Sequence, residues 1–334
     1  MTDRQIGVVP GARARHSCVV NLPLVDRCAQ FARAQTLDPS GTAGSYRGYV
    51  AVDVPLPWPD DIADHPTVAP VAGALAAAGL RVQGTVPDPA DGDGTRLATF
   101  LRPPGPFVAY EAAAWRLDPG DATVALAAIA ASAAAGGALD AGPATLVAEG
   151  EATGRLVLVC THGSRDACCG SLGTRLARSL PGLGAGVHVR RTSHTGGHRF
   201  APTALFLPEG TVWAYLDMDT LVAIADRTLD PELAARAYRG CTGLEGPEVQ
   251  AADGAALREV GWAWLDHRRS GAVVERDGDR TLVRLEGEAP DGTRRAFEAT
   301  VEVARVVPVP DCGKPIEQAR KSAPELRVRD LRTV

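Results

Sequence analysis

Two cysteines and two histidines lie within about forty residues in the middle of the chain. Cys160 ends an apolar run and Cys169 follows after eight intervening residues, whereas only Thr-Gly-Gly separates His194 from His198. Thiolates and imidazoles are the ligands that zinc and other thiophilic metals prefer. The pattern therefore predicts a four-ligand metal site made of Cys160, Cys169, His194 and His198.

The spacing of these residues differs from that of a zinc finger. In such fingers two to four residues separate the cysteines and about twelve precede the first histidine, but here the gaps are eight and twenty-four residues. A structural zinc site remains an alternative, without the support of a motif. A catalytic Cys–His pair is a second alternative, but it leaves the second cysteine and the second histidine without a role.

The local sequence around the four candidates suits metal binding. Cys169 stands at the start of a predicted helix, where free N–H groups and the helix dipole favour a thiolate. The neighbouring Cys168 is an alternative ligand, although adjacent side chains point in different directions. Gly196 and Gly197 disfavour a helix and predict a tight loop that lets the backbone approach a bulky inorganic core.

Further residues near the site are candidates for outer hydrogen bonds, which tune a metal centre. Arg191 and Arg199 flank the histidines, where they would favour a reduced centre or dock an acidic partner; solvated surface arginines are the plain alternative. The candidates for outer hydrogen bonds are His162, Gly196, Gly197 and Arg199. The remaining cysteines, expected to be ordinary buried thiols, are Cys18, Cys28, Cys241 and Cys312.

The elements around these residues predict an α/β layout. A β-α-β-β-α order follows residue 151, which is the order of a thioredoxin-like domain, and a similar order over 46–135 is expected to be a degenerate copy. The helix over 121–135 belongs to that first block. The elements predicted in the second block are strands over 155–160, 187–191, 203–208 and 211–217 and helices over 168–180 and 218–239, the last broken near Pro231.

Composition limits the class of protein. The chain has 334 residues, a net charge of −5 and a pI near 5.8, which argues against a nucleic-acid binder. Seven cysteines, an odd number, do not resemble a disulfide framework, and the first seventeen residues lack the apolar core of a secretory signal. The uncharged stretch Ala122–Leu139 is alanine-rich and is expected to be a buried helix, not a membrane span. We therefore expect a cytoplasmic protein with reduced thiols and no membrane contact.

The segment Cys-Thr-His-Gly-Ser-Arg-Asp-Ala-Cys-Cys, followed by His-Thr-Gly-Gly-His-Arg-Phe-Ala, resembles the sucrase/ferredoxin-like family of thioredoxin-like ferredoxins. The similarity is specific over 156–217 and weaker over 28–54. It implies a 2Fe–2S cluster bound by Cys160, Cys169, His194 and His198, with Cys168 as the alternative to Cys169. The order of predicted elements along the chain indicates three parts: an N-terminal α/β domain over 1–150, the ferredoxin domain over 151–240 and a small α+β region with a charged tail over 241–334.

Such a ligand set has a chemical consequence. Two ferric ions and two sulfides carry a charge of about +2, so two thiolates and two neutral imidazoles leave the cluster near zero, against about −2 with four thiolates. We therefore expect a potential above that of plant-type ferredoxins, and one that depends on pH. The expected function is electron transfer with a separate redox partner protein. A cluster-dependent reductase and a structural zinc-binding interaction module are the alternatives, and the sequence predicts no oligomeric state.

Overall fold

The computed structural model describes most of the chain, namely residues 27–89, 94–118, 120–142, 144–146, 154–180, 182–184 and 186–334. Cys18, the N-terminal stretch examined for a secretory signal and the expected domain boundary between residues 150 and 151 lie outside the described residues.

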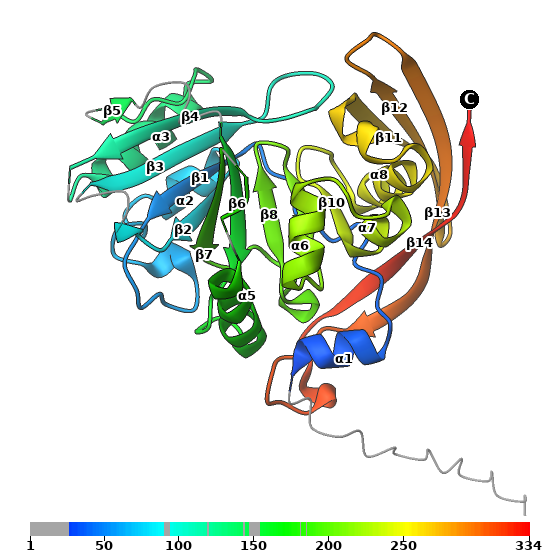
Figure 1. Ribbon diagram of the computed structural model, residues 1–334, viewed down its shortest axis with the longest axis horizontal. Coiled ribbons are helices and arrows are strands. Elements are labelled where there is room, and N and C mark those ends of the chain that lie inside the picture. Colours follow the sequence, from blue (N-terminus) through cyan, green and yellow to red (C-terminus); the bar gives the residue numbers. More distant parts are fainter. Residues whose placement is uncertain are drawn as a thin grey trace, which may run out of the picture.

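A single mixed sheet runs through the first two thirds of the described chain (Figure 1). Its strand order is β10-β9-β8-β6-β7-β2-β1-β3-β4-β5. The strands are β1 (Gly48–Asp53), β2 (Leu80–Thr85), β3 (Thr95–Leu101), β4 (Glu111–Leu117), β5 (Thr145–Leu146), β6 (Arg155–Cys160), β7 (Val187–Thr192), β8 (Ala204–Leu207), β9 (Thr211–Trp213) and β10 (Tyr238–Cys241).

The two halves of this sheet have the same pairing pattern. In the first half β1 lies parallel to β2 and antiparallel to β3, which pairs with β4. In the second half β6 lies parallel to β7 and antiparallel to β8, which pairs with β9. The halves meet where Thr85 of β2 pairs with Thr192 of β7. The repeated order predicted from the sequence is therefore present, and it builds one continuous sheet.

Helices pack on this sheet as the apolar pattern predicts. The alanine-rich stretch forms α3, in which Ala125, Leu126 and Ile129 are fully buried. Pro231 begins a new helix, because proline is tolerated in a first turn but not in a helix interior. The helical elements of these two halves are α1 (Cys28–Ala34), η1 (Ile62–Asp64), α2 (Ala72–Ala77), α3 (Ala122–Ala134), η3 (Cys169–Gly173), α5 (Thr174–Ser179), η4 (His198–Phe200), α6 (Met218–Ala225) and α7 (Pro231–Ala237).

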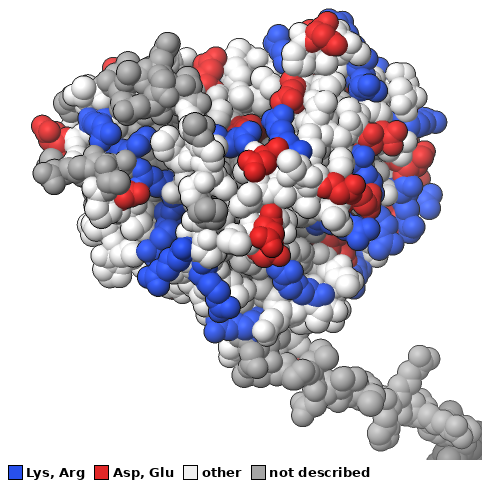
Figure 2. All heavy atoms as spheres, viewed as in Figure 1, with Lys and Arg blue, Asp and Glu red and all other residues white. Residues whose placement is uncertain are grey.

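In the described ranges, no helix is both long and apolar enough to cross a membrane. Figure 2 shows basic side chains gathered on one face near β7 and α5, whereas acidic and basic side chains alternate over the C-terminal sheet.

The C-terminal third is a helix followed by an antiparallel sheet in the order β11-β12-β13-β14. The charged tail forms a strand that pairs along β13. Its alternating apolar residues explain this, since Leu326 and Val328 pack on the core while Arg327 and Arg329 face outward. The elements are α8 (Pro247–Val260), η5 (Trp262–Asp266), β11 (Arg268–Asp277), β12 (Arg280–Glu288), β13 (Arg294–Pro308), η6 (Ile316–Gln318) and β14 (Ser322–Thr333).

A buried ion pair inside this third takes part in its contact with the large sheet. Arg269 of β11 and Asp253 of α8 are both fully buried and lie 2.9 Å apart, and Asp253 also accepts a hydrogen bond from the hydroxyl group of Tyr238 of β10 at 2.7 Å. The backbone of Arg269 also exchanges two hydrogen bonds with Phe107, which belongs to the first half. The connection between β13 and β14 then returns to α1 at the lower end of the molecule (Figure 1). The N-terminal helix α1 and the β13–β14 connection thus lie together beside Cys168, in the loop that follows β6.

Candidate metal centre

The predicted ligands lie at the ends of the two central parallel strands. Cys160 is the last residue of β6, and Cys169 begins η3, the π-helical turn that leads into α5. His194 and His198 follow β7 in the loop that leads into η4. Gly173 allows η3 to pack against β6, because a Cβ atom there would lie 1.9 Å from the carbonyl oxygen of Cys160.

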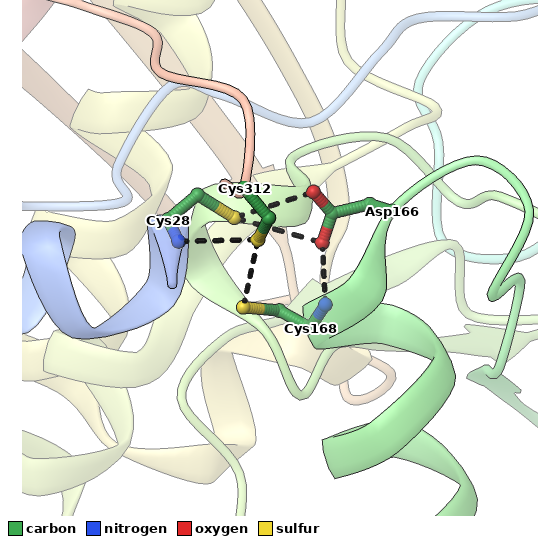
Figure 3. Close-up of side chains that lie close together, drawn as sticks. All are labelled: Cys28, Asp166, Cys168 and Cys312. Carbon is green, nitrogen blue, oxygen red and sulfur yellow. Dashed lines mark hydrogen bonds between the residues drawn. The ribbon is translucent and has the colours of Figure 1, made fainter. Parts of the chain in front are cut away.

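The adjacent cysteines belong to two different groups of side chains. Cys169 lies with Cys160 and His194, whereas Cys168 lies with Cys28, Cys312 and Asp166 (Figure 3). The Sγ atoms of Cys168 and Cys312 are 3.3 Å apart. Cys168, the alternative to Cys169 as a ligand, therefore does not lie with Cys160 and His194.

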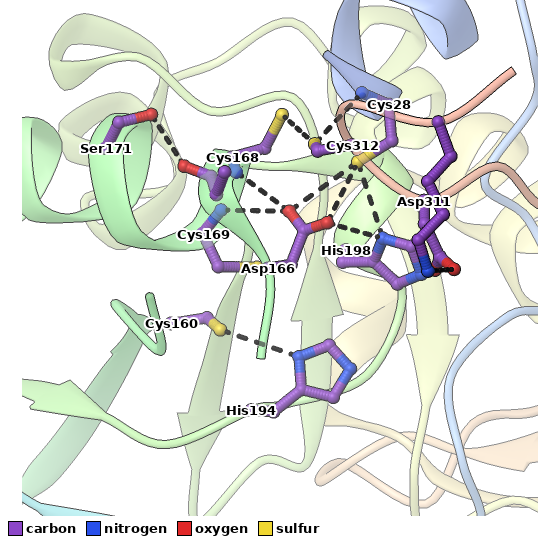
Figure 4. A network of polar contacts seen from close by, with 12 residues as sticks. Cys28, Cys160, Asp166, Cys168, Cys169, Ser171, His194, His198, Asp311 and Cys312 are labelled. Atoms are coloured by element: carbon purple, nitrogen blue, oxygen red, sulfur yellow. Dashed lines mark hydrogen bonds and ion pairs between the residues drawn. The ribbon is translucent and has the colours of Figure 1, made fainter. Parts of the chain in front are cut away.

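Cys160, Cys169 and His194 form what we call the first centre. One ligand atom from each lies within 4.8 Å of the other two, and Nδ1 of His194 points toward Sγ of Cys160 at 3.9 Å (Figure 4). Both cysteines are 1% exposed, while His194 is half-buried. Three of the four predicted ligands are thus together, with the thiols inside and an imidazole toward the surface.

The first centre favours one thiolate even before a metal binds. A shared hydrogen bond with Cys169 and the contact with His194 lower the pKa of Cys160 well below its ordinary value. The same hydrogen bond, together with burial, raises the pKa of Cys169. A cation that displaced the shared proton would make both sulfurs thiolates, the form in which cysteine binds metals.

His198 lies beside the first centre without joining the group of three. Its ring centroid is 6.0 Å from that of His194. Its Nδ1 atom lies 3.1 Å from Oδ2 of Asp166 and 3.4 Å from Sγ of Cys28, so Nε2 is the nitrogen left for another partner. A histidine whose second nitrogen is held by a carboxylate is a common arrangement around metals.

Asp166 connects the two groups of side chains. Its Oδ1 atom accepts hydrogen bonds from the backbone N–H groups of Cys168 and Cys169, at 2.8 and 3.3 Å. Its Oδ2 atom faces His198 and Cys28. Asp166 directly precedes the helical residues that begin at residue 167, a position where an aspartate is a common capping residue.

The histidine loop is held by an arginine that the sequence analysis missed. Gly196 and Gly197 both adopt positive φ angles, 86° and 66°, and form the predicted tight loop. Arg239 of β10 is 2% exposed and donates a hydrogen bond to the carbonyl oxygen of Gly196 at 3.0 Å. Burial lowers the pKa of Arg239 to about 10. No local sequence pattern predicts this contact, because forty-two residues lie between Gly196 and Arg239.

The other residues expected around the site differ in position. Nδ1 of His162 accepts a hydrogen bond from the backbone N–H of His194 at 3.1 Å, so this side chain positions the loop. Arg199 is 5% exposed and lies over the ring of Phe200 at 4.7 Å. Its expected roles as a docking residue or a solvated arginine are wrong, because the stacked guanidinium is inside the protein. Arg191 is half-buried in β7.

Two cavities reach the histidines from outside. One, of about 530 Å³, is lined by His162, His194 and Gly196. The other, of about 550 Å³, is lined by His198 and Cys312. Its basic lining residues are Arg165, Lys314, Arg320 and Lys321. The histidine side of the site is therefore the side that is open to solvent.

Comparison with known proteins identifies the family of this chain. The model of the sucrase/ferredoxin-like family matches residues 39–240, which include both cysteines and both histidines. The chain belongs to the sucrase/ferredoxin-like family. Over 102 residues it is 30% identical to Altered inheritance of mitochondria protein 32 of Meyerozyma guilliermondii, a match that covers 28% of this chain and 36% of that protein.

This sucrase/ferredoxin-like chain therefore matches about a third of the length of that curated relative. No solved structure gives a significant match. The name of the family carries no argument for sugar hydrolysis, which needs a pair of carboxylates in a cleft.

Proposed function

We propose that this protein transfers electrons through one 2Fe–2S cluster bound by Cys160, Cys169, His194 and His198. The observation that carries the proposal is the first centre, where two buried thiols and an imidazole nitrogen lie within 4.8 Å of one another. The fourth ligand stands beside it, since the rings of the two histidines are 6.0 Å apart. Membership of the sucrase/ferredoxin-like family agrees with this proposal.

The position of His198 favours a cluster over a single ion. A single metal ion needs all of its ligand atoms around one point, and His198 is not among the side chains that meet that condition. In a two-iron cluster each iron takes two protein ligands, so two cysteines can bind one iron and two histidines the other, as in Rieske centres. The donor set therefore fits a 2Fe–2S cluster better than it fits zinc.

Two buried polar atoms, in residues that directly follow predicted ligands, agree with this assignment. Within the described part of the chain, Oγ1 of Thr161 and Nε of Arg199 are buried and have no hydrogen-bond partner. Thr161 follows Cys160 directly, and Arg199 follows His198. Buried donors of this kind are costly when unpaired, and hydrogen bonds to sulfur are a normal means of tuning a cluster.

The cluster would supply one-electron redox chemistry, and the protein would set its potential. The buried cysteines would exclude water from their side of the cluster. The half-buried histidines would give a short path for electron transfer between the cluster and the protein surface. Two imidazoles in place of two thiolates leave less negative charge at the site, which favours reduction. We propose a potential above that of plant-type ferredoxins, coupled to proton uptake at a histidine.

The surroundings extend this proposal. The identical strand order of the two halves of the sheet supports a thioredoxin-like domain over 151–240 and a degenerate copy before it. The six cysteines within the described ranges are free, which agrees with a reducing compartment such as the cytoplasm. Electrons would come from a separate redox partner protein.

The test begins with the full-length protein purified without oxygen. We expect a coloured sample with about two iron and two labile sulfide ions per chain. His194→Cys and His198→Cys should each keep the cluster and lower its midpoint potential, because a thiolate adds negative charge. His188→Cys, in β7, is the matched control and should leave the potential unchanged. Unchanged potentials in all three variants, or a colourless sample with zinc and no iron, would refute the proposal.

A second candidate, the cluster-dependent reduction of a small molecule, is favoured by the cavity beside His198. Its volume of about 550 Å³ suits a small molecule, and its four basic lining residues outnumber the three aspartates there, which favours a small anion. The cluster-bearing protein, supplied with a defined electron donor, should then oxidise that donor only when an acceptor is present. Donor oxidation that is independent of any small acceptor would leave electron transfer between proteins as the function.

A further inference from the structure

A second group of metal-binding side chains lies next to the first centre and shares no ligand with the predicted cluster. Cys28 begins α1, Cys168 precedes η3, and Cys312 lies in the connection between β13 and β14. Together with Asp166 they bring one ligand atom each to within 4.8 Å of one another. Cys28 and Cys168 are fully buried and Cys312 is half-buried (Figure 3). These four residues are called the second centre below.

The distances in the second centre lie within about 0.5 Å of the edges of a tetrahedral metal site. Zinc binds sulfur at about 2.3 Å and carboxylate oxygen at about 2.0–2.2 Å, which gives tetrahedral edges of about 3.8 Å between sulfurs and about 3.5 Å between sulfur and oxygen. Sγ of Cys168 is 3.3 Å from Sγ of Cys312, and Sγ of Cys28 is 3.5 Å from Oδ2 of Asp166. A disulfide would need sulfurs about 2.05 Å apart, and these cysteines are free.

The charges of the second centre favour a bound cation. Asp166 is 7% exposed, and Cys28 and Cys168 are fully buried. The Asp166 carboxylate therefore shares a buried space with thiols that bind metals as thiolates. A cation bound there would displace the thiol protons and would compensate buried negative charge, which is costly when it has no partner.

We propose that Cys28, Cys168, Cys312 and Asp166 bind one zinc ion, separate from the iron–sulfur cluster. The three thiols come from parts of the chain up to 284 residues apart. The ion would therefore fasten α1 and the β13–β14 connection to the loop after β6, as structural zinc sites fasten segments that have little core of their own. α1 has only seven residues and no side-chain cap at its N-terminus, so the ion would add a restraint at the start of this short helix.

The zinc site would also support the histidine loop. Asp166 would bind zinc through an oxygen that faces Nδ1 of His198, so the ion would fix the carboxylate that orients this ring. Zinc binding does not depend on what the first centre holds, and metal analysis separates the two proposals.

The first test measures zinc and iron in the full-length protein purified without oxygen. We expect about one zinc per chain in the wild type, and at least a tenfold loss of zinc in Cys312→Ser and Cys168→Ser with iron largely retained. Cys160→Ser should show the reverse, losing iron and keeping zinc. Cys241→Ser replaces a fully buried cysteine away from both centres and should change neither metal.

A second measurement does not depend on iron or on the stability of a variant that lacks one of the four zinc ligands. Cys160→Ser protein, refolded or grown with Co²⁺, should show thiolate-to-cobalt charge-transfer absorption and the intense visible bands of a tetrahedral site. Adding Zn²⁺ should abolish these bands. Absence of zinc from the wild type together with absence of the cobalt bands would overturn the proposal. So would loss of iron in place of zinc from folded Cys312→Ser, or a Cys168–Cys312 disulfide in the protein purified without oxygen.

Discussion

The Nδ1 atom of His198 lies 3.1 Å from Oδ2 of Asp166. Because Oδ1 of the same carboxylate is held by the backbone N–H groups of Cys168 and Cys169, Asp166 cannot rotate freely. The carboxylate therefore fixes both the start of η3, where one predicted ligand lies, and the ring of another. Twenty-eight residues lie between Cys169 and His198 in the sequence, but the side chain of Asp166 contacts the backbone of the first and the ring of the second (Figure 4).

Replacing Asp166 by asparagine tests this role. Asn keeps the shape but loses the charge that orients His198, so we expect iron to leave about 10–100-fold more readily when a chelator is added, the usual cost of losing such a partner. Zinc retention should fall as well, since Asp166 belongs to the second centre. Asp266→Asn is the control, because this carboxylate lies in η5 and pairs with Arg227 at 2.8 Å. Equal iron release from both variants would count against the role of Asp166.

Arg239 provides a second test, on the histidine loop. Arg239→Ala removes the donor to the carbonyl oxygen of Gly196 and leaves that oxygen and the partners of Arg239 at Thr42 unpaired inside the protein. We expect a loss of about 3 kcal/mol in the free energy of unfolding, measured with urea on the metal-free protein, because hydrogen bonds to a buried charge are each worth about 1.5–3 kcal/mol.

The control for Arg239 lies one turn away on the preceding helix. Arg236 is exposed and pairs with Glu232 in the same helix, so Arg236→Ala should cost less than about 0.5 kcal/mol. If the two variants unfolded at the same urea concentration, Arg239 would not hold the loop.

Gly197→Ala tests the same contact from the other side. Gly197 has a φ of 66°, and a Cβ atom there would lie 2.5 Å from Nη2 of Arg239. The left-handed conformation costs a residue with a side chain about 1–2 kcal/mol, and the clash displaces Arg239 as well. We expect lower stability and weaker iron retention, measured on the same samples. Gly184→Ala meets no neighbouring atom and should match the wild type.

How much of this could be read from the sequence depends on the range of each interaction. The strand ending at Cys160 and the helix break at Pro231 follow from local apolar runs and from proline geometry, so both are confirmed. The convergence of Cys160, Cys169 and His194 was also predicted, from their residue types and from the family resemblance. The structure brings them together because β6 and β7 are adjacent parallel strands, whose carboxyl ends meet at one edge of the sheet.

The second centre lay beyond such reasoning. Cys28 and Cys312 looked like ordinary buried thiols, because no local pattern shows that α1 and the β13–β14 connection lie beside Cys168. The only signal was the adjacent pair Cys168–Cys169, whose side chains must point apart and therefore need two different partners. Arg199 was misplaced for a related reason, since its stacking on Phe200 depends on tertiary packing.

The two histidines should contribute differently to the pH dependence of the potential. His194 turns Nδ1 toward Cys160 and its ring lines a cavity of about 530 Å³, whereas Nδ1 of His198 is held by Asp166. Reduction adds negative charge and favours proton uptake, so the potential should fall as pH rises, by at most about 59 mV per pH unit for one proton and one electron. His194→Cys removes the nitrogen that faces the cavity and should flatten this slope, while His198→Cys should keep most of it. Redox titrations of the cluster-bearing variants between pH 6 and pH 9 measure both slopes. A slope that vanished in His198→Cys but persisted in His194→Cys would reverse the assignment.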